Sequence, residues 1–215
     1  MKISILAGGP TPYLPPLVDV PMDAHIWVGV DRGVFTLLEK GMEPHVAFGD
    51  FDSVSPREWQ LISSRVEEVN RYRPEKDETD LELALNWAAE QDPEDITIYG
   101  ATGGRLDHFM GNVQLLLKDD LKGISVRLVD SLNEMYIKRP GEHEVEMNPR
   151  YTYISFVPIS PIVKGLTLSG FKYPLTNRNI YWGSTLCISN ELIQSHGTFS
   201  FSDGIIMVIR SNDAS

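Results

Sequence analysis

Short apolar runs alternate with helix-forming segments over the first 139 residues, and this alternation stops after Pro140-Gly141. Runs of this length, closed by Gly, Pro or Asp, are typical of strands. In the first part of the chain they are residues 2–7, 26–30, 46–48, 66–70, 96–99 and 125–129. Strands that alternate with helices form a mostly parallel sheet with helices on both faces. We therefore predict an α/β domain over residues 1–139.

Two of the predicted helices begin at capping boxes. Ser55-Pro56-Arg57-Glu58 combines an N-cap serine, a glutamate three residues later and a proline at the first helical position. Thr79-Asp80-Leu81-Glu82 repeats the box without the proline, and apolar residues follow it at helical spacing. We therefore expect Ser55 and Thr79 to cap helices.

The segment after Pro140-Gly141 has a different rhythm, because no helical pattern joins its short β-branched or aromatic runs. These runs are residues 151–157, 163–168, 184–188, 197–201 and 205–210. Ser202-Asp203-Gly204, between the last two runs, is a hairpin signal. We predict a small antiparallel β domain over residues 140–215, built as a sandwich or a partly open barrel. Phe199 and Phe201 alternate on one strand face and are expected to pack in its core.

Charge and cysteine content disfavour several classes of protein. The net charge is −11, and residues 1–139 carry 24 acidic and 14 basic residues, against 6 and 5 in residues 140–215. Nucleic-acid binding is disfavoured because phosphate neutralisation needs clustered Lys and Arg. The sequence has no run of 18 apolar residues to span a membrane, and no apolar signal segment to direct export. The single cysteine, Cys187, excludes an internal disulfide, fits a cytoplasmic protein and is expected in the core.

Carboxylates gather where the predicted strands end. Gly49-Asp50-Phe51-Asp52-Ser53 directly follows the third run, and Asp31 directly follows the second. Asp77 and Asp80 flank a helix start, and Asp107 lies eight residues past the fifth run. Ligands bind beyond the carboxyl ends of parallel strands, so we expect these groups at one edge of the sheet. Crowded carboxylates repel each other unless a cation lies between them, which predicts a Mg²⁺ site, although each aspartate alone also has a plain structural explanation.

A glycine-rich turn supplies the second half of the predicted site. Gly100-Ala101-Thr102-Gly103-Gly104-Arg105 follows the fifth run and precedes a helix. Glycines let backbone N–H groups approach a phosphate, the helix N-terminus favours an anion, and Arg105 adds a charged fork. The turn is not a Walker A loop, because no Gly-Lys-Ser/Thr follows it. Beside the carboxylates it predicts a Mg–nucleotide site, in which His108 is either structural or a hydrogen-bond donor to phosphate.

Ordered motifs run along nearly the whole chain. In the first part they are Asp31-Arg32-Gly33, Gly49-Asp50-Phe51-Asp52-Ser53, Lys76-Asp77-Glu78-Thr79-Asp80 and Gly103-Gly104-Arg105-Leu106-Asp107-His108. In the second part they are Gly170-Phe171-Lys172-Tyr173-Pro174-Leu175, Gly183-Ser184-Thr185, Ile188-Ser189-Asn190-Glu191 and Ile209-Arg210-Ser211. In this order and spacing the chain resembles the thiamine pyrophosphokinase (thiamine diphosphokinase) family. Phe171 departs from the leucine usual in the family, and Leu186-Cys187 from the small or basic residues often found there.

The resemblance implies an α/β catalytic domain that binds ATP and Mg²⁺, followed by a β domain that binds thiamine. It implies transfer of a pyrophosphoryl group from ATP to thiamine, with release of AMP, by a homodimer whose active sites lie between subunits. The residues implied near Mg²⁺ are Asp31, Asp50, Asp52, Asp77 and Asp80. Those implied in the nucleotide site are Asp31, Arg32, Gly33, Ser53, Lys76, Asp77, Thr79, Gly103, Gly104, Arg105, Asp107 and His108. The residues implied in catalysis are Asp50, Asp52, Asp80 and Arg105, and those implied in thiamine binding are Ser189 and Asn190.

Two other interpretations remain open from the sequence. Asp50-Phe51-Asp52-Ser53-Val54 fits the DxDx(T/V) motif of haloacid-dehalogenase-type phosphatases, in which the first aspartate attacks phosphorus. That motif usually follows the first strand, whereas here it follows the third, which favours a ligand role. The second interpretation is a non-catalytic module that binds a nucleotide or thiamine. The intact set of acidic residues argues against it, since a binding module has little need for so many carboxylates.

Overall fold

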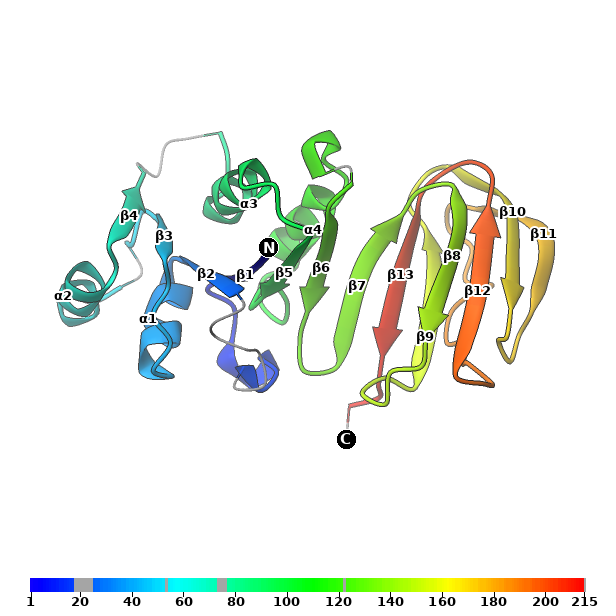
Figure 1. Ribbon diagram of the computed structural model, residues 1–215, viewed down its shortest axis with the longest axis horizontal. Coiled ribbons are helices and arrows are strands. Elements are labelled where there is room, and N and C mark those ends of the chain that lie inside the picture. The colour runs from blue at the N-terminus through cyan, green and yellow to red at the C-terminus, as the bar shows by residue number, and fades with distance from the viewer. Residues whose placement is uncertain (18–24, 53, 73–76, 122, 215) are drawn as a thin grey trace. The chain divides into compact units, whose positions relative to one another are not determined.

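The computed structural model describes residues 1–17, 25–52, 54–72, 77–121 and 123–214 (Figure 1). The chain forms two compact units, Met1–Ser131 and Leu132–Ser215. The first unit is a parallel α/β unit, and the second consists of antiparallel strands. The functional domains predicted at residues 1–139 and 140–215 stay a prediction.

Six parallel strands form the sheet of the first unit, in the order β4-β3-β2-β1-β5-β6. They are β1 (Lys2–Leu6), β2 (His25–Val30), β3 (Val46–Gly49), β4 (Glu68–Arg71), β5 (Asp95–Tyr99) and β6 (Ser125–Val129). All six predicted strands are confirmed, with ends that differ by no more than two residues. The central strands β1 and β5 are almost wholly buried, as expected for a parallel sheet that is covered on both faces.

The order of the strands reverses direction between β1 and β5. From β1 the next strands are added toward β4, whereas β5 and β6 are added on the opposite side of β1. Crossovers between parallel strands are right-handed, so α1 (Arg32–Glu39) and α2 (Pro56–Arg65) cover one face, and α3 (Asp80–Glu90) and α4 (Leu106–Leu115) cover the other. In agreement, α1 contacts α2, and α3 contacts α4 (Figure 1). The boundary between β1 and β5 is therefore the topological switch point, where a ligand crevice opens in sheets of this kind.

The predicted caps are confirmed at both helix starts, but only one full capping box forms. Ser55 accepts a hydrogen bond from the Glu58 N–H, and the Glu58 carboxylate accepts one from the Ser55 N–H at 2.6 Å. Thr79 likewise accepts from the Glu82 N–H, at 3.2 Å. The Glu82 carboxylate instead pairs with Lys118 Nζ at 2.6 Å, so the predicted reciprocal bond of the second box is replaced by an ion pair. Among the described residues, no helix has the length and apolar character needed to cross a bilayer.

Two apolar clusters make up much of the core of the first unit. In one, Trp27 stacks on Tyr99 with ring centroids 5.9 Å apart. In the other, Phe51 of the acidic loop packs with Val34 of α1 and Ile62 of α2. Burying an apolar side chain of this size contributes about 1.5–3 kcal/mol. Phe51 therefore ties the predicted metal-binding loop to the core.

Two antiparallel sheets pack against each other in the second unit, which confirms the predicted sandwich. One has the order β7-β13-β9 and the other β11-β10-β12-β8. The strands are β7 (Asn133–Lys138), β8 (Gly141–Glu146), β9 (Tyr153–Pro158), β10 (Ile162–Ser169), β11 (Leu175–Tyr181), β12 (His196–Phe201) and β13 (Ile206–Ser211). Phe156 and Val208 of the first sheet share a buried cluster with Phe199 and Phe201 of the second. Cys187 lies in this cluster, so its predicted core position is also confirmed.

Two predictions for the second unit are wrong. Residues 184–188 form turns rather than a strand, because Leu186 and Ile188 are exposed and only Cys187 points into the core. Ser202-Asp203-Gly204 is not a hairpin, because it joins β12 and β13, which belong to different sheets. The sequence also gave no signal for β7, β8 and β11. In β8 and β11 most side chains are exposed and polar, which breaks the apolar run that marks a strand.

Candidate active site

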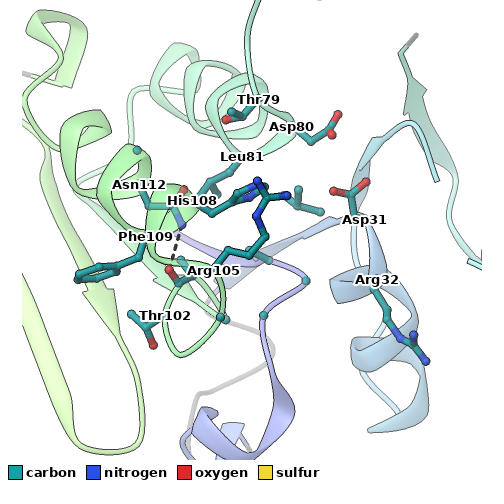
Figure 2. Close-up of a pocket in the computed structure, with 18 of the residues that line it drawn as sticks. Asp31, Arg32, Thr79, Asp80, Leu81, Thr102, Arg105, His108, Phe109 and Asn112 are labelled. Carbon is teal, nitrogen blue, oxygen red and sulfur yellow. Dashed lines mark hydrogen bonds between the residues drawn. The ribbon is translucent and has the colours of Figure 1, made fainter. Parts of the chain in front are cut away.

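A cleft of about 710 Å³ opens at the switch point of the first unit (Figure 2). Its floor is the chain directly after β1, at Ala7-Gly8-Gly9-Pro10, and the loop after β5, at Gly100-Ala101-Thr102 and Gly104-Arg105. Its sides come from the start of α1, the start of α3 and the first two turns of α4. The cleft thus lies beyond the carboxyl ends of the strands, as the position of the acidic residues predicts.

The two loops of the floor lie backbone against backbone. The Gly9 N–H donates to the Gly100 carbonyl at 2.8 Å. A Cβ atom at Gly9 would lie 2.2 Å from the Gly100 oxygen, and one at Gly100 would lie 2.5 Å from the Ala7 oxygen. Neither position has room for a side chain, so close approach of the two loops requires both glycines. In the sequence, Gly8-Gly9-Pro10 only marks the end of the first apolar run, and its place in the site was not predicted.

Asp31 lines the cleft from the junction of β2 and α1. Its φ is 49°, a backbone conformation that costs a non-glycine residue about 1–3 kcal/mol. Residues in such conformations cluster at functional sites. Its N–H donates to the Phe48 carbonyl at 2.8 Å, which ties it to the end of β3. A Cβ atom at Gly49 would lie 2.3 Å from Asp31 Oδ1. Gly49 thus leaves the space that the Asp31 carboxylate occupies.

The acidic loop after β3 is anchored by its middle residue. Phe51 has a φ of 57°, is buried, and packs on Trp59 with ring centroids 5.2 Å apart. The Asp52 N–H donates to Asp50 Oδ1 at 3.0 Å, which closes a tight turn around Phe51. Asp50 and Asp52 are not among the residues that line the cleft. Gly49, directly before Asp50, lies against Asp31, which does line the cleft.

The start of α3 carries the acid on the opposite side of the cleft. Thr79 caps the helix, and Asp80 occupies its first position, where the positive end of the helix dipole favours a carboxylate. Figure 2 shows Asp80 and Asp31 at the same end of the cleft, from two different elements. Asp77 is exposed and does not line the cleft.

Arg105 and Asp107 form a two-contact ion pair at the start of α4. Arg105 Nε donates to Asp107 Oδ1 at 3.1 Å, and an Nη atom donates to Oδ2 at 2.5 Å. The Arg105 guanidinium, followed by the His108 N–H that donates at 2.9 Å, lowers the pKa of Asp107 from 3.8 to about 2. The same pair raises the pKa of Arg105. Both side chains are more than 60 % exposed, so the guanidinium is accessible to a ligand with a stronger negative charge.

The cleft brings together a majority of the site residues predicted in the first unit. Those that line it are Asp31, Arg32, Thr79, Asp80, Gly104, Arg105, Asp107 and His108. Those that do not are Gly33, Asp50, Asp52, Asp77 and Gly103. The predicted residues Ser53 and Lys76 lie outside the described part of the chain. Gly33 is required by packing instead, since a Cβ atom at this position would lie 2.1 Å from the Leu6 carbonyl oxygen.

No group of three or more His, Cys, Asp or Glu side chains within the described ranges is close enough to hold a metal ion by itself. Mg²⁺ at nucleotide sites is usually bound by one or two carboxylates together with waters and substrate phosphates. The paired placement of Asp31 and Asp80 fits that pattern. The predicted five-aspartate metal set stays a prediction.

Ser189 and Asn190 lie in the second unit and differ in what their side chains do. Asn190 is buried, and its amide donates to the Tyr173 carbonyl at 2.9 Å. Its oxygen accepts from the N–H groups of Tyr173 and Glu191, at 3.0 and 2.9 Å. Ser189 is exposed, and its backbone has a φ of 56°. Asn190 therefore fixes the loop around Tyr173, while the Ser189 hydroxyl is accessible.

A parallel α/β sheet with carboxylates and a glycine-rich loop at its switch point is typical of the α/β proteins that bind a ligand such as a nucleotide beyond their strand ends, and here a β-sandwich follows it along the chain. The family model "Thiamin pyrophosphokinase, catalytic domain" matches residues 19–128, and "Thiamin pyrophosphokinase, vitamin B1 binding domain" matches residues 142–206. The chain belongs to the thiamine pyrophosphokinase family.

Individual relatives support the same assignment. A thiamine pyrophosphokinase of Bacillus subtilis is 50% identical over 211 residues, which is 98% of this chain and 99% of the relative. The crystal structure of thiamine pyrophosphokinase from Bacillus subtilis superposes with a TM-score of 0.93 at 48% identity, covering 100% of both chains. That of thiamin pyrophosphokinase from Geobacillus thermodenitrificans superposes with a TM-score of 0.92 at 50% identity, covering 100% of this chain and 99% of the other. The family expected from the ordered motifs is confirmed.

Proposed function

We propose that this chain is a thiamine diphosphokinase, which transfers the pyrophosphoryl group of ATP to thiamine and releases thiamine diphosphate and AMP. The observation that carries the proposal is 50% identity to a thiamine pyrophosphokinase over 98% of the chain. The cleft supports it independently, because it combines carboxylates with a glycine-rich loop and an arginine. These are the groups that phosphoryl transfer needs, since such reactions depend mainly on positioning and on neutralising charge.

In this proposal the floor loops and the start of α4 hold the nucleotide phosphates. The glycine backbones admit close approach, and the helix N-terminus adds a favourable dipole. Arg105 exchanges Asp107 for a phosphate oxygen, which keeps its charge-assisted hydrogen bonds. The thiamine hydroxyl gives its proton to a carboxylate of the site, and its oxygen attacks the β-phosphorus in line. The bond from that phosphorus to the oxygen of the α-phosphate breaks, and AMP leaves with the electron pair. Arg105 stabilises the negative charge on the group in transit.

Mg²⁺ is the proposed metal, held by Asp31 and Asp80 at the cleft and by Asp50 and Asp52 of the neighbouring loop, with Asp77 close by. The donor set consists of carboxylate oxygens, which suit a hard cation. When bound, Mg²⁺ neutralises charge on the phosphate oxygens. The strained backbone of Asp31 supports the assignment, because strain of this kind is typical of functional sites. Gly49 supports it as well, because it leaves space for the Asp31 carboxylate.

We assign ATP and Mg²⁺ binding to residues 1–139 and thiamine binding to residues 140–215. The match of residues 142–206 to a vitamin B1 binding domain supports the second assignment. Within that part, Ser189 is proposed to contact thiamine directly. Asn190, whose amide is engaged by Tyr173 and Glu191, is proposed to shape the loop that thiamine meets.

We further propose that the active form is a homodimer in which each thiamine contacts both chains. The second unit has several large apolar side chains with more than 40 % of their surface exposed. They are Tyr173, Tyr181, Trp182, Leu186, Ile188 and Ile193. Exposed apolar side chains that adjoin on a surface are typical of sites that bind a ligand or another protein, so these residues are the proposed contacts.

One assay separates this function from its alternatives. The purified protein is incubated with thiamine, ATP and Mg²⁺, and the products are resolved by HPLC. We expect thiamine diphosphate and AMP in equal amounts. Phosphate release without thiamine, together with an aspartyl-phosphate adduct, would identify a phosphatase that uses Asp50. Tight binding of thiamine or ATP by folded protein, without either product, would identify a binding module.

A further inference from the structure

We propose that Asn112, which lines the cleft, and Asp130, which does not, are positioning residues for the nucleotide that act through the Gly100–Arg105 loop. The proposal rests on the function above, because it assigns the loop to the phosphates of ATP. Three consecutive loop residues are each held by a different part of the first unit. The Gly100 carbonyl accepts from the Gly9 N–H, and the next two residues are held by Asn112 and Asp130.

Asn112 holds Ala101. It lies in the second turn of α4, and its Nδ2 donates to the Ala101 carbonyl at 2.9 Å. Figure 2 shows this bond reaching from the helix down to the loop. A carbonyl oxygen that faced the cleft would repel a polyphosphate. Asn112 binds that oxygen at the α4 side, so this carbonyl is kept from turning toward the phosphates.

Asp130 holds Thr102. The Thr102 hydroxyl donates to Asp130 Oδ2 at 2.8 Å, and both residues are at least nine-tenths buried. Asp130 directly follows β6, so this bond joins the loop to the strand next to β5. A hydrogen bond to a carboxylate is stronger than one between neutral groups, and burial strengthens it further. In Figure 2 the Thr102 side chain lies apart from the Arg105 guanidinium, so the hydroxyl serves the loop rather than the anion.

These contacts fix the loop before the nucleotide arrives. A loop that is already in its bound conformation loses little conformational entropy on binding, which strengthens binding without any new ligand contact. Removing one contact should therefore weaken ATP binding more than it slows the chemical step. Thiamine binding should be nearly unchanged, because Asn112 and Asp130 do not belong to the part of the chain assigned to thiamine.

The test compares matched variants by their kcat and their separate KM values for ATP and thiamine. Thr102→Val removes the hydroxyl at nearly constant volume, and Thr102→Ser retains it. Asn112→Ala removes the donor, and Asn112→Asp replaces it with a group that repels the Ala101 oxygen. Gln91→Ala is the control, because Gln91 also donates from its amide to a backbone carbonyl, that of Trp87, but at the far end of α3.

We expect the ATP KM to rise about tenfold in Thr102→Val and Asn112→Ala, and more in Asn112→Asp. The thiamine KM should change less than twofold, and Thr102→Ser and Gln91→Ala should behave as wild type. Equilibrium binding of a non-hydrolysable ATP analogue should weaken by the same factors. An unchanged ATP KM in Thr102→Val and Asn112→Ala would overturn the proposal, as would a loss in Thr102→Ser equal to that in Thr102→Val. Wild-type protein that binds ATP but makes no thiamine diphosphate would contradict the proposed function instead, while the binding series would still test the loop.

Discussion

At the scale of single residues, the Arg105–Asp107 ion pair controls the ionisation of Asp107 in the cleft. Asp107 has its pKa lowered to about 2 by the Arg105 guanidinium and then by the His108 N–H. Because the pKa of Asp107 is lower in the folded state, the ionised carboxylate stabilises the fold. This contribution is fully present at pH values above 3.8, the pKa in the unfolded state. That contribution is lost as pH falls through about 2. The pair is therefore intact at neutral pH, where the phosphates of a nucleotide are ionised.

We predict that the Asp107 side-chain carboxyl titrates with a midpoint near 2 in ¹³C NMR spectra of the folded protein. In Arg105→Ala the midpoint should move up toward 3.8, because the largest cause of the shift is removed. Arg32→Ala is the matched control: Arg32 also lines the cleft, but it pairs with Glu58. A midpoint that responds equally to both variants would show that the general field of the cleft, and not the Arg105 pair, lowers the pKa.

Gly49→Ala tests the space beside Asp31. The new Cβ atom would meet Asp31 Oδ1 at 2.3 Å, so the carboxylate or the strand end must move. We predict a loss of about 1–3 kcal/mol in the free energy of unfolding, measured with urea, and a fall in kcat/KM of at least tenfold. Gly41→Ala is the control, since it also places alanine at a positive φ but has open space around it. Full activity of Gly49→Ala would separate the Asp31 position from catalysis.

At the scale of elements, two helix caps of similar strength should have different effects on function. Ser55 caps α2 and does not line the switch-point cleft, whereas Thr79 lines the cleft, caps α3 and precedes Asp80. We predict that Ser55→Ala and Thr79→Ala each lower the free energy of unfolding by about 1 kcal/mol. Only Thr79→Ala should also raise the concentration of Mg²⁺ needed for half-maximal turnover. Thr79→Ser, which retains the cap, should restore both properties, and the prediction fails if Ser55→Ala changes the Mg²⁺ requirement as much.

The elements of the first unit could be predicted from sequence because each carries its own signal. Its central strands are buried on both faces, so they appear as apolar runs, and α2 and α3 begin at side-chain caps. In the second unit β8 and β11 expose most of their side chains, and their polar sequences give no such run. The apolar residues 186–188 gave a false signal, because composition does not reveal which side chains the turn leaves exposed.

The candidate site was also predictable only where its residues carry a local sequence signal. The rule that ligands bind beyond strand ends predicted Asp31 and the Gly100–Arg105 loop at one edge of the sheet, and Asp31 and most of the loop line the cleft there. It could not select Asn112 or Asp130, which act through contacts with residues 11 and 28 positions away. Such contacts depend on how α4 and β6 pack, and no local pattern records that. Ser189 and Asn190 were predicted from the family resemblance alone, because no local pattern marks them.

At the scale of the whole molecule, the proposed homodimer can be measured directly. We predict a mass near twice the 24.2 kDa of one chain by size-exclusion chromatography with light scattering. Substituting the exposed aromatic Trp182 by Asp should shift the protein toward the single-chain mass, because a charge in an apolar interface is costly. Tyr13→Asp is the control, since Tyr13 is also an exposed aromatic residue but lies in the first unit. A wild-type mass equal to one chain would refute the dimer.

The lone thiol gives the sandwich an internal probe of opening. Cys187 is the only cysteine, it is 4 % exposed in the core of the second unit, and burial raises its pKa. Thiol reagents need both access and the thiolate form, so alkylation of the intact protein must wait for that core to open. Because the first unit contains no cysteine, labelling kinetics report on the second unit alone. The rate at which the core of the second unit opens can thus be measured without introducing a dye, a tag or a mutation.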